Sequence, residues 1–358
     1  MVPQLSNSPR VTRSRVSTLI TVVLFGPKSG TESSTKVSSD SVDFIDGSDR
    51  RLADAEAGRL NELIESVDSQ FVAFLERDAV PPREVLVDQA DSLASDSSAI
   101  ACLATGGRIG PLWSSTSPRV AVLIAPPEQV GCLLLRGGAL TASALPEVGH
   151  PLWDRLIRQV ASGAKVLVEP SDRVPAFTGR GPSLAPGEPP ASDDWLRAHL
   201  LETAPGDLVD PAGSHADAVA LKAGLLQVHD FLEESHVCCQ SVQHEGIHNA
   251  PDYWHAIMHR REPDYGNSKY WWHHTGEHPL FPELAAGART ILVNCDSEDA
   301  SAWSERLTAD GRWDPFGFVD LCALVNGSND MALVEAAEQI QHLELSLLLG
   351  ATYADATG

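Results

Sequence analysis

Hydrophobic residues in the second half of the chain recur at steps of three and four positions, the spacing of one face of an α-helix. Asp314 can cap a helix that starts at Pro315. Pro263 must end the helix that precedes residue 263, because proline has no amide hydrogen. Gly276 is suited to ending the next helix. The pattern predicts an all-α region, with helices at Asp194–Thr203, Ser214–Val242, Pro251–Glu262, Tyr265–Thr275, Phe281–Val293, Pro315–Val325 and Asp330–Tyr353.

The first half of the chain mixes helical spacing with short β-branched runs that end at Pro or Gly. This mixture predicts a small α/β layer. No glycine-rich segment in it has the spacing of a nucleotide-binding loop. The predicted elements are a helix at Asp49–Arg77, neighbouring strands at Val120–Ala125 and Val130–Leu135, a helix at Pro151–Val160 that Gly163 ends, and a strand at Lys165–Glu169.

A stretch rich in Pro and Gly, Val174–Ser192, separates these two patterns and predicts an interdomain linker. The length of 358 residues also favours two domains. We therefore expect an α+β two-domain protein, with a small α/β domain over 46–173 and an all-α domain over 193–358. Residues 1–45 are expected to be a poorly ordered leader, in which the apolar run Val16–Phe25 is too short to span a bilayer.

Charge narrows the classes of partner. Asp and Glu number 49 against 26 Lys and Arg, which gives a net charge of −23. This charge repels phosphate backbones and anionic lipid, so we expect neither nucleic acid nor membrane as a partner. The six cysteines form no CxxC pair, which favours scattered thiols in a reducing compartment and a cytoplasmic location.

Histidines gather in one segment: nine of the 13 lie between His229 and His278. On a helix that begins near Pro251, the spacings of three, four and three place four ligand-type side chains on one face. Imidazoles four residues apart can bind one metal ion, although no Glu follows the first of them as in the HExxH zinc proteases. The candidate metal ligands on this face are Asp252, His255, His259 and Glu262.

A second helix repeats the arrangement, at steps of four, three and four, with His229, Glu233, His236 and Gln240. If the two stripes face each other, they form a polar site in the core of a helix bundle, to which Glu338 and His342 of a later helix can add. The alternative is that these groups hydrogen-bond one another and fix the register of the helices.

The corner after Pro263 is a candidate site for a small anionic molecule. Its donors stand near two arginines, and guanidinium groups bind carboxylate or phosphate in a bidentate manner. The alternative is that Arg261 and Asp264 form an ion pair that only secures the corner. The candidate substrate-binding residues are Arg260, Arg261, Asn267, Lys269 and Tyr270.

The run DYWHAIMHRREPDYGNSKYWW, with LKAGLLQVHDFLEESH before it and WDPFGFVDLC after it, resembles an uncharacterised family of bacterial proteins with distant fungal relatives, built around a YWHxIxHRREPDYxNxKYW core. The resemblance covers about residues 205–350. It implies a shared helical domain and no particular activity. His273 and His274 stand where similar proteins are expected to have Arg.

Two functional hypotheses follow. The first is an enzyme that uses His255, His259, Glu262 and Asp264 as metal ligands or general acid/base groups, with a divalent metal ion as cofactor. The second is a non-catalytic binding or scaffold module, in which the histidines are structural and a core or a partner surface is formed by Trp254, Tyr270, Trp271 and Trp272. The sequence specifies neither the reaction nor the oligomeric state.

Overall fold

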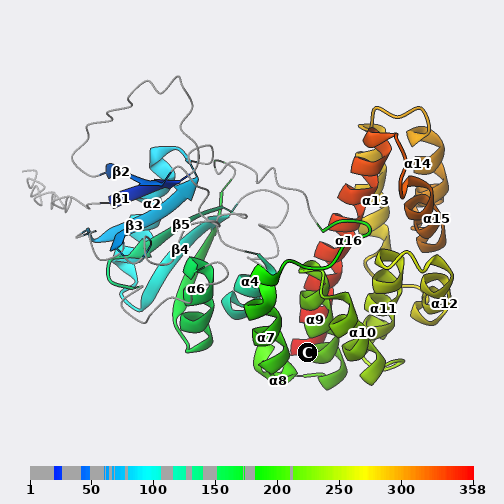
Figure 1. The fold of residues 1–358 in the computed structure, drawn as a ribbon, viewed down its shortest axis with the longest axis horizontal. Helices are drawn as coiled ribbons and strands as arrows, with labels where there is room; N and C mark the ends of the chain where they lie inside the picture. The colour runs from blue at the N-terminus through cyan, green and yellow to red at the C-terminus, as the bar shows by residue number, and fades with distance from the viewer. Residues whose placement is uncertain are drawn as a thin grey trace, which may run out of the picture.

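The computed structural model describes residues 20–25, 42–48, 60, 62–63, 67, 69–76, 80–105, 116–125, 131–139, 151–171, 173, 182–209 and 213–358. Figure 1 shows a sheet built from the first half of the chain beside the helices of the second half. An α+β composition, as the sequence predicts, is therefore observed. No helix among the described residues is both long and apolar enough to cross a membrane.

The sheet has six strands in the order β2-β1-β3-β5-β4-β6 (Figure 1). β1 pairs in parallel with β2 and β3, β4 pairs in parallel with β6, and β5 runs antiparallel between β3 and β4. The sheet is therefore mixed. The strands are β1 (Ile20–Phe25), β2 (Val42–Ser48), β3 (Phe71–Glu76), β4 (Ala99–Thr105), β5 (Gly131–Arg136) and β6 (Lys165–Pro170).

Both faces of the sheet are covered by apolar side chains. Along β3, Phe71 and Leu75 belong to a cluster with Leu86 of α2 (Arg83–Ser95), whereas Val72 and Phe74 belong to the cluster on the other face. That second cluster includes side chains of α4 (Pro118–Ile124) and α6 (Pro151–Ala161). A strand buried on both faces is apolar at successive positions, so its sequence lacks strand alternation.

Burial on both faces explains two incorrect predictions in the first half of the chain. Phe71–Glu76 is a strand, not the end of the predicted helix Asp49–Arg77, since an apolar run of this length suits either structure until it pairs with neighbours. Ile20–Phe25, expected in a poorly ordered leader, is instead β1, with β2 on one side and β3 on the other.

The predicted strand Val120–Ala125 is wrong as well. It lies in α4, because Ser117 accepts a hydrogen bond from the Val120 amide and Pro118 occupies the first turn, so the helix start outweighs the β-branched residues. The predictions for β5, α6 and β6 are confirmed. The sequence pattern did not predict β2, α2 or β4.

The second half is helical, as predicted. The cap at Asp314 and the stops at Pro263 and Gly276 are confirmed, and Asp264 caps the helix that begins at Tyr265. The predicted helix Ser214–Val242 is two helices. The helices are α7 (Asp194–Glu202), α8 (Pro205–Leu208), α9 (His215–Val228), α10 (Leu232–Ser241), α11 (Ala250–Arg261), α12 (Tyr265–Thr275), α13 (Phe281–Val293), α14 (Ala300–Thr308), α15 (Pro315–Val325) and α16 (Met331–Thr357), with short 3-10 turns at Ala191–Asp193, Ile247–Asn249 and Ala309–Gly311.

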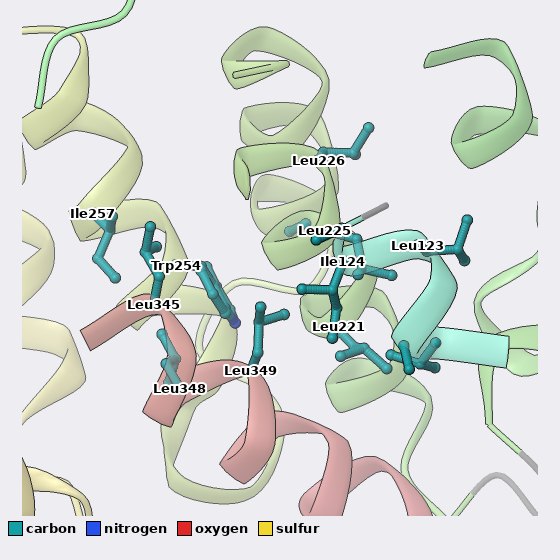
Figure 2. Packing of buried hydrophobic residues seen from close by; sticks show 14 of the residues in the cluster. Leu123, Ile124, Leu221, Leu225, Leu226, Trp254, Ile257, Leu345, Leu348 and Leu349 are labelled. Atoms are coloured by element: carbon teal, nitrogen blue, oxygen red, sulfur yellow. The ribbon is translucent and has the colours of Figure 1, made fainter. Parts of the chain in front are cut away.

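The core of the helical region lies around α9, α11 and α16. Figure 2 shows Trp254 of α11 beside Leu345 and Leu349 of α16. The Trp254 indole donates a hydrogen bond to Thr352 Oγ1 at 3.1 Å, which satisfies its buried N–H. The same apolar cluster continues into α4 at Leu123, so the two halves share one core and the two-domain organisation stays a prediction.

The described part of the predicted linker is held against the helices. The carbonyl oxygen of Ser183 accepts hydrogen bonds from Arg261 Nε at 3.2 Å and Gln341 Nε2 at 3.0 Å. Gln341 also bonds the Pro182 carbonyl oxygen at 3.0 Å. Residues 174–181 lie outside the described residues.

The packing of α9 on α11 predicts a large effect of one methyl group. A Cβ on Gly224 would lie 2.5 Å from Trp254 Cζ2, so we expect Gly224→Ala to lower the free energy of unfolding by about 1–3 kcal/mol. Gly266→Ala in α12 is the control, because its Cβ would meet nothing closer than 3.9 Å; it should stabilise by about 0.5–1 kcal/mol. Urea unfolding measures both. Equal changes in the free energy of unfolding for the two variants would contradict the close packing of Gly224 against Trp254.

Candidate metal centre

Every residue of α11 is buried, although the helix carries several ionisable side chains. It begins after Asn249, with Pro251 in its first turn, and ends before Pro263. The neighbouring helices α9, α10 and α12 pack around it. Burial of a polar group costs free energy unless the group finds a partner, so the partners of these side chains show what each one does.

Three histidines meet between α10 and α11. The ring centroid of His236 lies 4.7 Å from that of His255 and 5.2 Å from that of His259, and the latter two are 4.9 Å apart. One nitrogen from each ring lies within 4.8 Å of the others, and no further group of this kind occurs within the described ranges. We call these residues the histidine triad.

His255 is the most unusual member of the triad. Its exposed fraction is 1%, and neither ring nitrogen has a hydrogen-bond partner among the described residues. The ring stacks on Trp271 with centroids 3.8 Å apart. A neutral imidazole has one donor and one acceptor nitrogen, so leaving both without a partner is costly.

His255 and His259 are held in the neutral form. Burial lowers the pKa of His255 to about 3, and the neighbouring His259, His236 and His244 act in the same direction. Burial, and then His236, lowers the pKa of His259 to about 4, against an opposing effect of Asp264. Both rings therefore keep an uncharged lone pair at neutral pH, which is the form that binds a metal ion.

Polar groups from α11 and α12 border His259. Its Nδ1 lies 3.3 Å from a carboxylate oxygen of Glu262, and its Nε2 lies 3.0 Å from Nδ2 of Asn267. A carboxylate on one nitrogen orients the ring and leaves the other for a ligand, so Asn267 must move aside if Nε2 is to bind a metal. Burial raises the pKa of Glu262; His236 opposes this effect, and Glu233 and Asp264 add to it.

Asp252 shares the helix face of His255 but has other partners. Its Oδ1 accepts the backbone N–H of His244 at 3.0 Å, and its Oδ2 lies 2.9 Å from Nδ1 of the same residue. The structure therefore does not place Asp252 with the triad.

The second predicted stripe is divided by a chain reversal. α9 ends at Val228, His229 caps it, and Asp230 follows with a φ of 64° before α10 starts. His229 Nε2 lies 2.6 Å from the carbonyl oxygen of Leu123, away from α10, and burial lowers the pKa of the ring. Glu233 acts on Glu262 through its charge alone. Of the predicted metal ligands, the structure thus gathers the triad, with Glu262 at its edge.

Arg260 is a buried structural cation, not a surface donor. Its Nη2 donates to a carboxylate oxygen of Glu344 in α16 at 2.6 Å, and its guanidinium lies 4.5 Å above the ring of Phe318. The Tyr253 hydroxyl donates to the second oxygen of Glu344 at 3.2 Å. This network ties α11 to α15 and α16.

Arg261 is also bound within the protein. Its Nη1 donates to the Gln227 carbonyl oxygen at 2.5 Å, and its Nη2 pairs with Asp230. The alternative ion pair with Asp264 is wrong, because Asp264 instead caps α12 through the Asn267 amide at 3.2 Å.

The remaining predicted anion-binding residues do not join the arginines. Lys269 Nζ pairs with Asp320 at 2.5 Å, and Asp320 also pairs with Arg306. Tyr270 is half exposed, and its ring meets those of Trp271 and His274. Each cation of the predicted anion site already has a carboxylate or carbonyl partner.

Sequence reasoning overlooked His244. It lies in the segment between α10 and α11, where helical spacing does not apply, so no periodic signal connects it with Asp252. The only available sign was its place among the clustered histidines.

No family model matches the chain, and no curated protein is significantly similar to it. Among solved structures, a mannosyltransferase, PcManGT from Pyrobaculum calidifontis in complex with GDP-Man and Mn2+, has 13% sequence identity with this chain. The match covers 86% of each chain with a TM-score of 0.33. A likeness at this level carries no argument about function.

The lowered pKa values predict acid sensitivity of the metal-free protein. Unfolded histidines take up protons below about pH 6.5, whereas folded His255 and His259 stay neutral to about 3 and 4, so the unfolded state binds more protons in that window. Stability should therefore fall as the pH drops from about 6.5 towards 4, by roughly 1.4 kcal/mol per pH unit for each histidine.

Urea unfolding with a chelator present, repeated across this pH range, measures the slope. His255→Phe should reduce the slope of the free energy of unfolding against pH by the contribution of His255. His273→Gln, at an exposed position, should leave this slope unchanged. An unchanged slope in His255→Phe would show that His255 takes up protons alike in the folded and unfolded states.

Proposed function

We propose that the histidine triad binds one divalent transition-metal ion and that this ion carries the chemistry of the protein. The observation that supports the proposal is His255, whose two buried nitrogens lack hydrogen-bond partners among the described residues while two further imidazoles lie beside it. A metal ion would satisfy one nitrogen from each ring. It would also turn a costly cluster into a stabilising one.

The ligand chemistry favours zinc. Neutral imidazoles suit Zn²⁺ and its neighbours in the transition series, whereas Mg²⁺ and Ca²⁺ prefer oxygen ligands. Three protein ligands leave a fourth tetrahedral position open, which is the pattern of catalytic rather than structural zinc. Water in such a position ionises near neutral pH.

The residues beside the triad suit proton transfer. Glu262 borders His259, and its raised pKa brings it closer to the range in which a carboxylate exchanges protons at neutral pH. We therefore propose metal-assisted hydrolysis or hydration of a small molecule. An anionic substrate would bind through the metal ion, because Arg260 and Arg261 are engaged within the protein.

One observation favours the scaffold alternative. His255 stacks on Trp271 as an aromatic ring would in a purely structural core. On this view, the triad is a packed set of rings and the protein binds no metal. The two proposals differ in whether the His255 nitrogens serve to bind a metal ion or to stabilise the fold.

Metal content is the first test. Protein purified without a histidine tag should contain close to one zinc per chain, and the His255→Ala/His259→Ala double variant should lose it while staying folded. Elemental analysis gives the metal content, and circular dichroism gives the fold. His273→Ala, at an exposed histidine of α12, should keep the metal. Metal absent from the wild type after growth with added zinc would overturn the proposal.

The stability of His255→Phe separates the two proposals. If the nitrogens serve a metal, their removal relieves buried polar groups while the stack on Trp271 remains, so the metal-free protein should gain about 1–3 kcal/mol. Urea unfolding with a chelator present gives the value. A loss of stability of similar size would favour structural nitrogens and the scaffold.

A further inference from the structure

A short loop beside the triad has an unusual backbone. Between α10 and α11, His244, Gly246, His248 and Asn249 all have positive φ, at 62°, 83°, 60° and 53°. Residues other than glycine adopt this region at a cost, which persists where surrounding contacts enforce it.

Two buried carboxylates enforce the loop. Asp217 of α9 accepts the Ile247 amide at 2.9 Å, and Asp252 of α11 accepts the His244 amide at 3.0 Å. Both carboxylates are at most 1% exposed. The backbone of the loop is therefore fixed without any help from the His244 side chain.

The second oxygen of Asp252 fixes that side chain as well. It lies 2.9 Å from Nδ1 of His244, and an ionised carboxylate can only accept, so Nδ1 carries the proton. The basic lone pair is then on Nε2. Since 48% of the side chain is exposed, this ring is available to solvent, unlike the buried rings of the triad.

Trp271 lies beside both His244 and the triad. The ring of His244 stacks near Trp271, with centroids 5.7 Å apart, and Trp271 also stacks on His255, with centroids 3.8 Å apart. His274 of α12 lies at 4.7 Å from His244. An exposed imidazole with a buried carboxylate behind it is the arrangement that makes histidine a general base.

We propose that His244 is a general base, oriented by Asp252, that takes a proton at Nε2 from water or from a hydroxyl group of a bound molecule. The oxygen keeps the electron pair of the broken O–H bond and uses it to form a bond to an electrophilic carbon or phosphorus atom of the bound molecule. The bond from that atom to its leaving group breaks, the leaving group takes the bonding pair, and the imidazolium, stabilised by Asp252, gives it the proton. This inference goes beyond the metal centre, because the Asp252–His244 pair needs no metal to form.

A second histidine–aspartate pair in the same loop provides a matched control. His248 Nδ1 lies 3.0 Å from Asp355, and these side chains are 42% and 15% exposed. Asp355→Asn removes the charge behind His248 and leaves the Asp252–His244 pair untouched. Asp252→Asn keeps a side-chain oxygen for the His244 amide but removes the carboxylate that fixes the ring.

Carbethoxylation by diethyl pyrocarbonate tests the proposal, because the reagent forms a bond to an unprotonated imidazole nitrogen and releases carbon dioxide and ethanol. The full chain is treated with a chelator present, and mass spectrometry of peptides gives the rate for each histidine. His244 should react faster than the exposed His215. Asp252→Asn should slow His244 roughly tenfold, the factor of one charge-assisted hydrogen bond, and Asp355→Asn should not.

Imidazole ¹⁵N chemical shifts of the wild type give a second readout that needs no variant. They should show the Nδ1–H form of His244. The proposal is overturned if His244 reacts no faster than His215, if Asp252→Asn leaves its rate unchanged in a folded protein, or if the proton sits on Nε2. These results do not depend on whether the triad binds a metal ion, because a chelator keeps the protein metal-free throughout.

Discussion

The structure depends on the burial of α11. All of its residues are buried, and the helix nonetheless carries Asp252, Arg260 and Arg261. A buried charge is tolerated only with a partner, and each partner comes from a different element: the loop after α10, the helix α16, and the turn between α9 and α10. These contacts fix how the surrounding helices meet α11.

His255 departs from this rule of paired groups. Each charged side chain of α11 has at least one partner, although Nε and Nη1 of Arg260 make no hydrogen bond, whereas neither nitrogen of the buried His255 ring has a partner, within the described residues. Buried groups that lower stability often lie at functional sites, because the same groups bind a ligand. The neighbouring Asp252–His244 pair is the opposite case, a satisfied and half-exposed imidazole. The triad, through His255, and the His244 imidazole therefore both contact Trp271.

Much of the helical half was predictable, because its information is local. Proline and capping residues set the ends of α11, α12 and α15, and four-residue spacing placed His255 and His259 on one face. The break at Asp230 was missed, because the apolar pattern continues through it. In the sheet, β3 is buried on both faces, so its sequence did not distinguish a strand from a helix.

By itself, the sequence determined the helical class of the second half, the ends of its central helices and the segment that carries the candidate chemistry. Tertiary structure decided the partners. It brought His236 to the triad, took Asp252 to His244, and enclosed both arginines in the core. The physical reason is that helical spacing fixes which side chains share a face, whereas partners on other elements depend on how those elements pack.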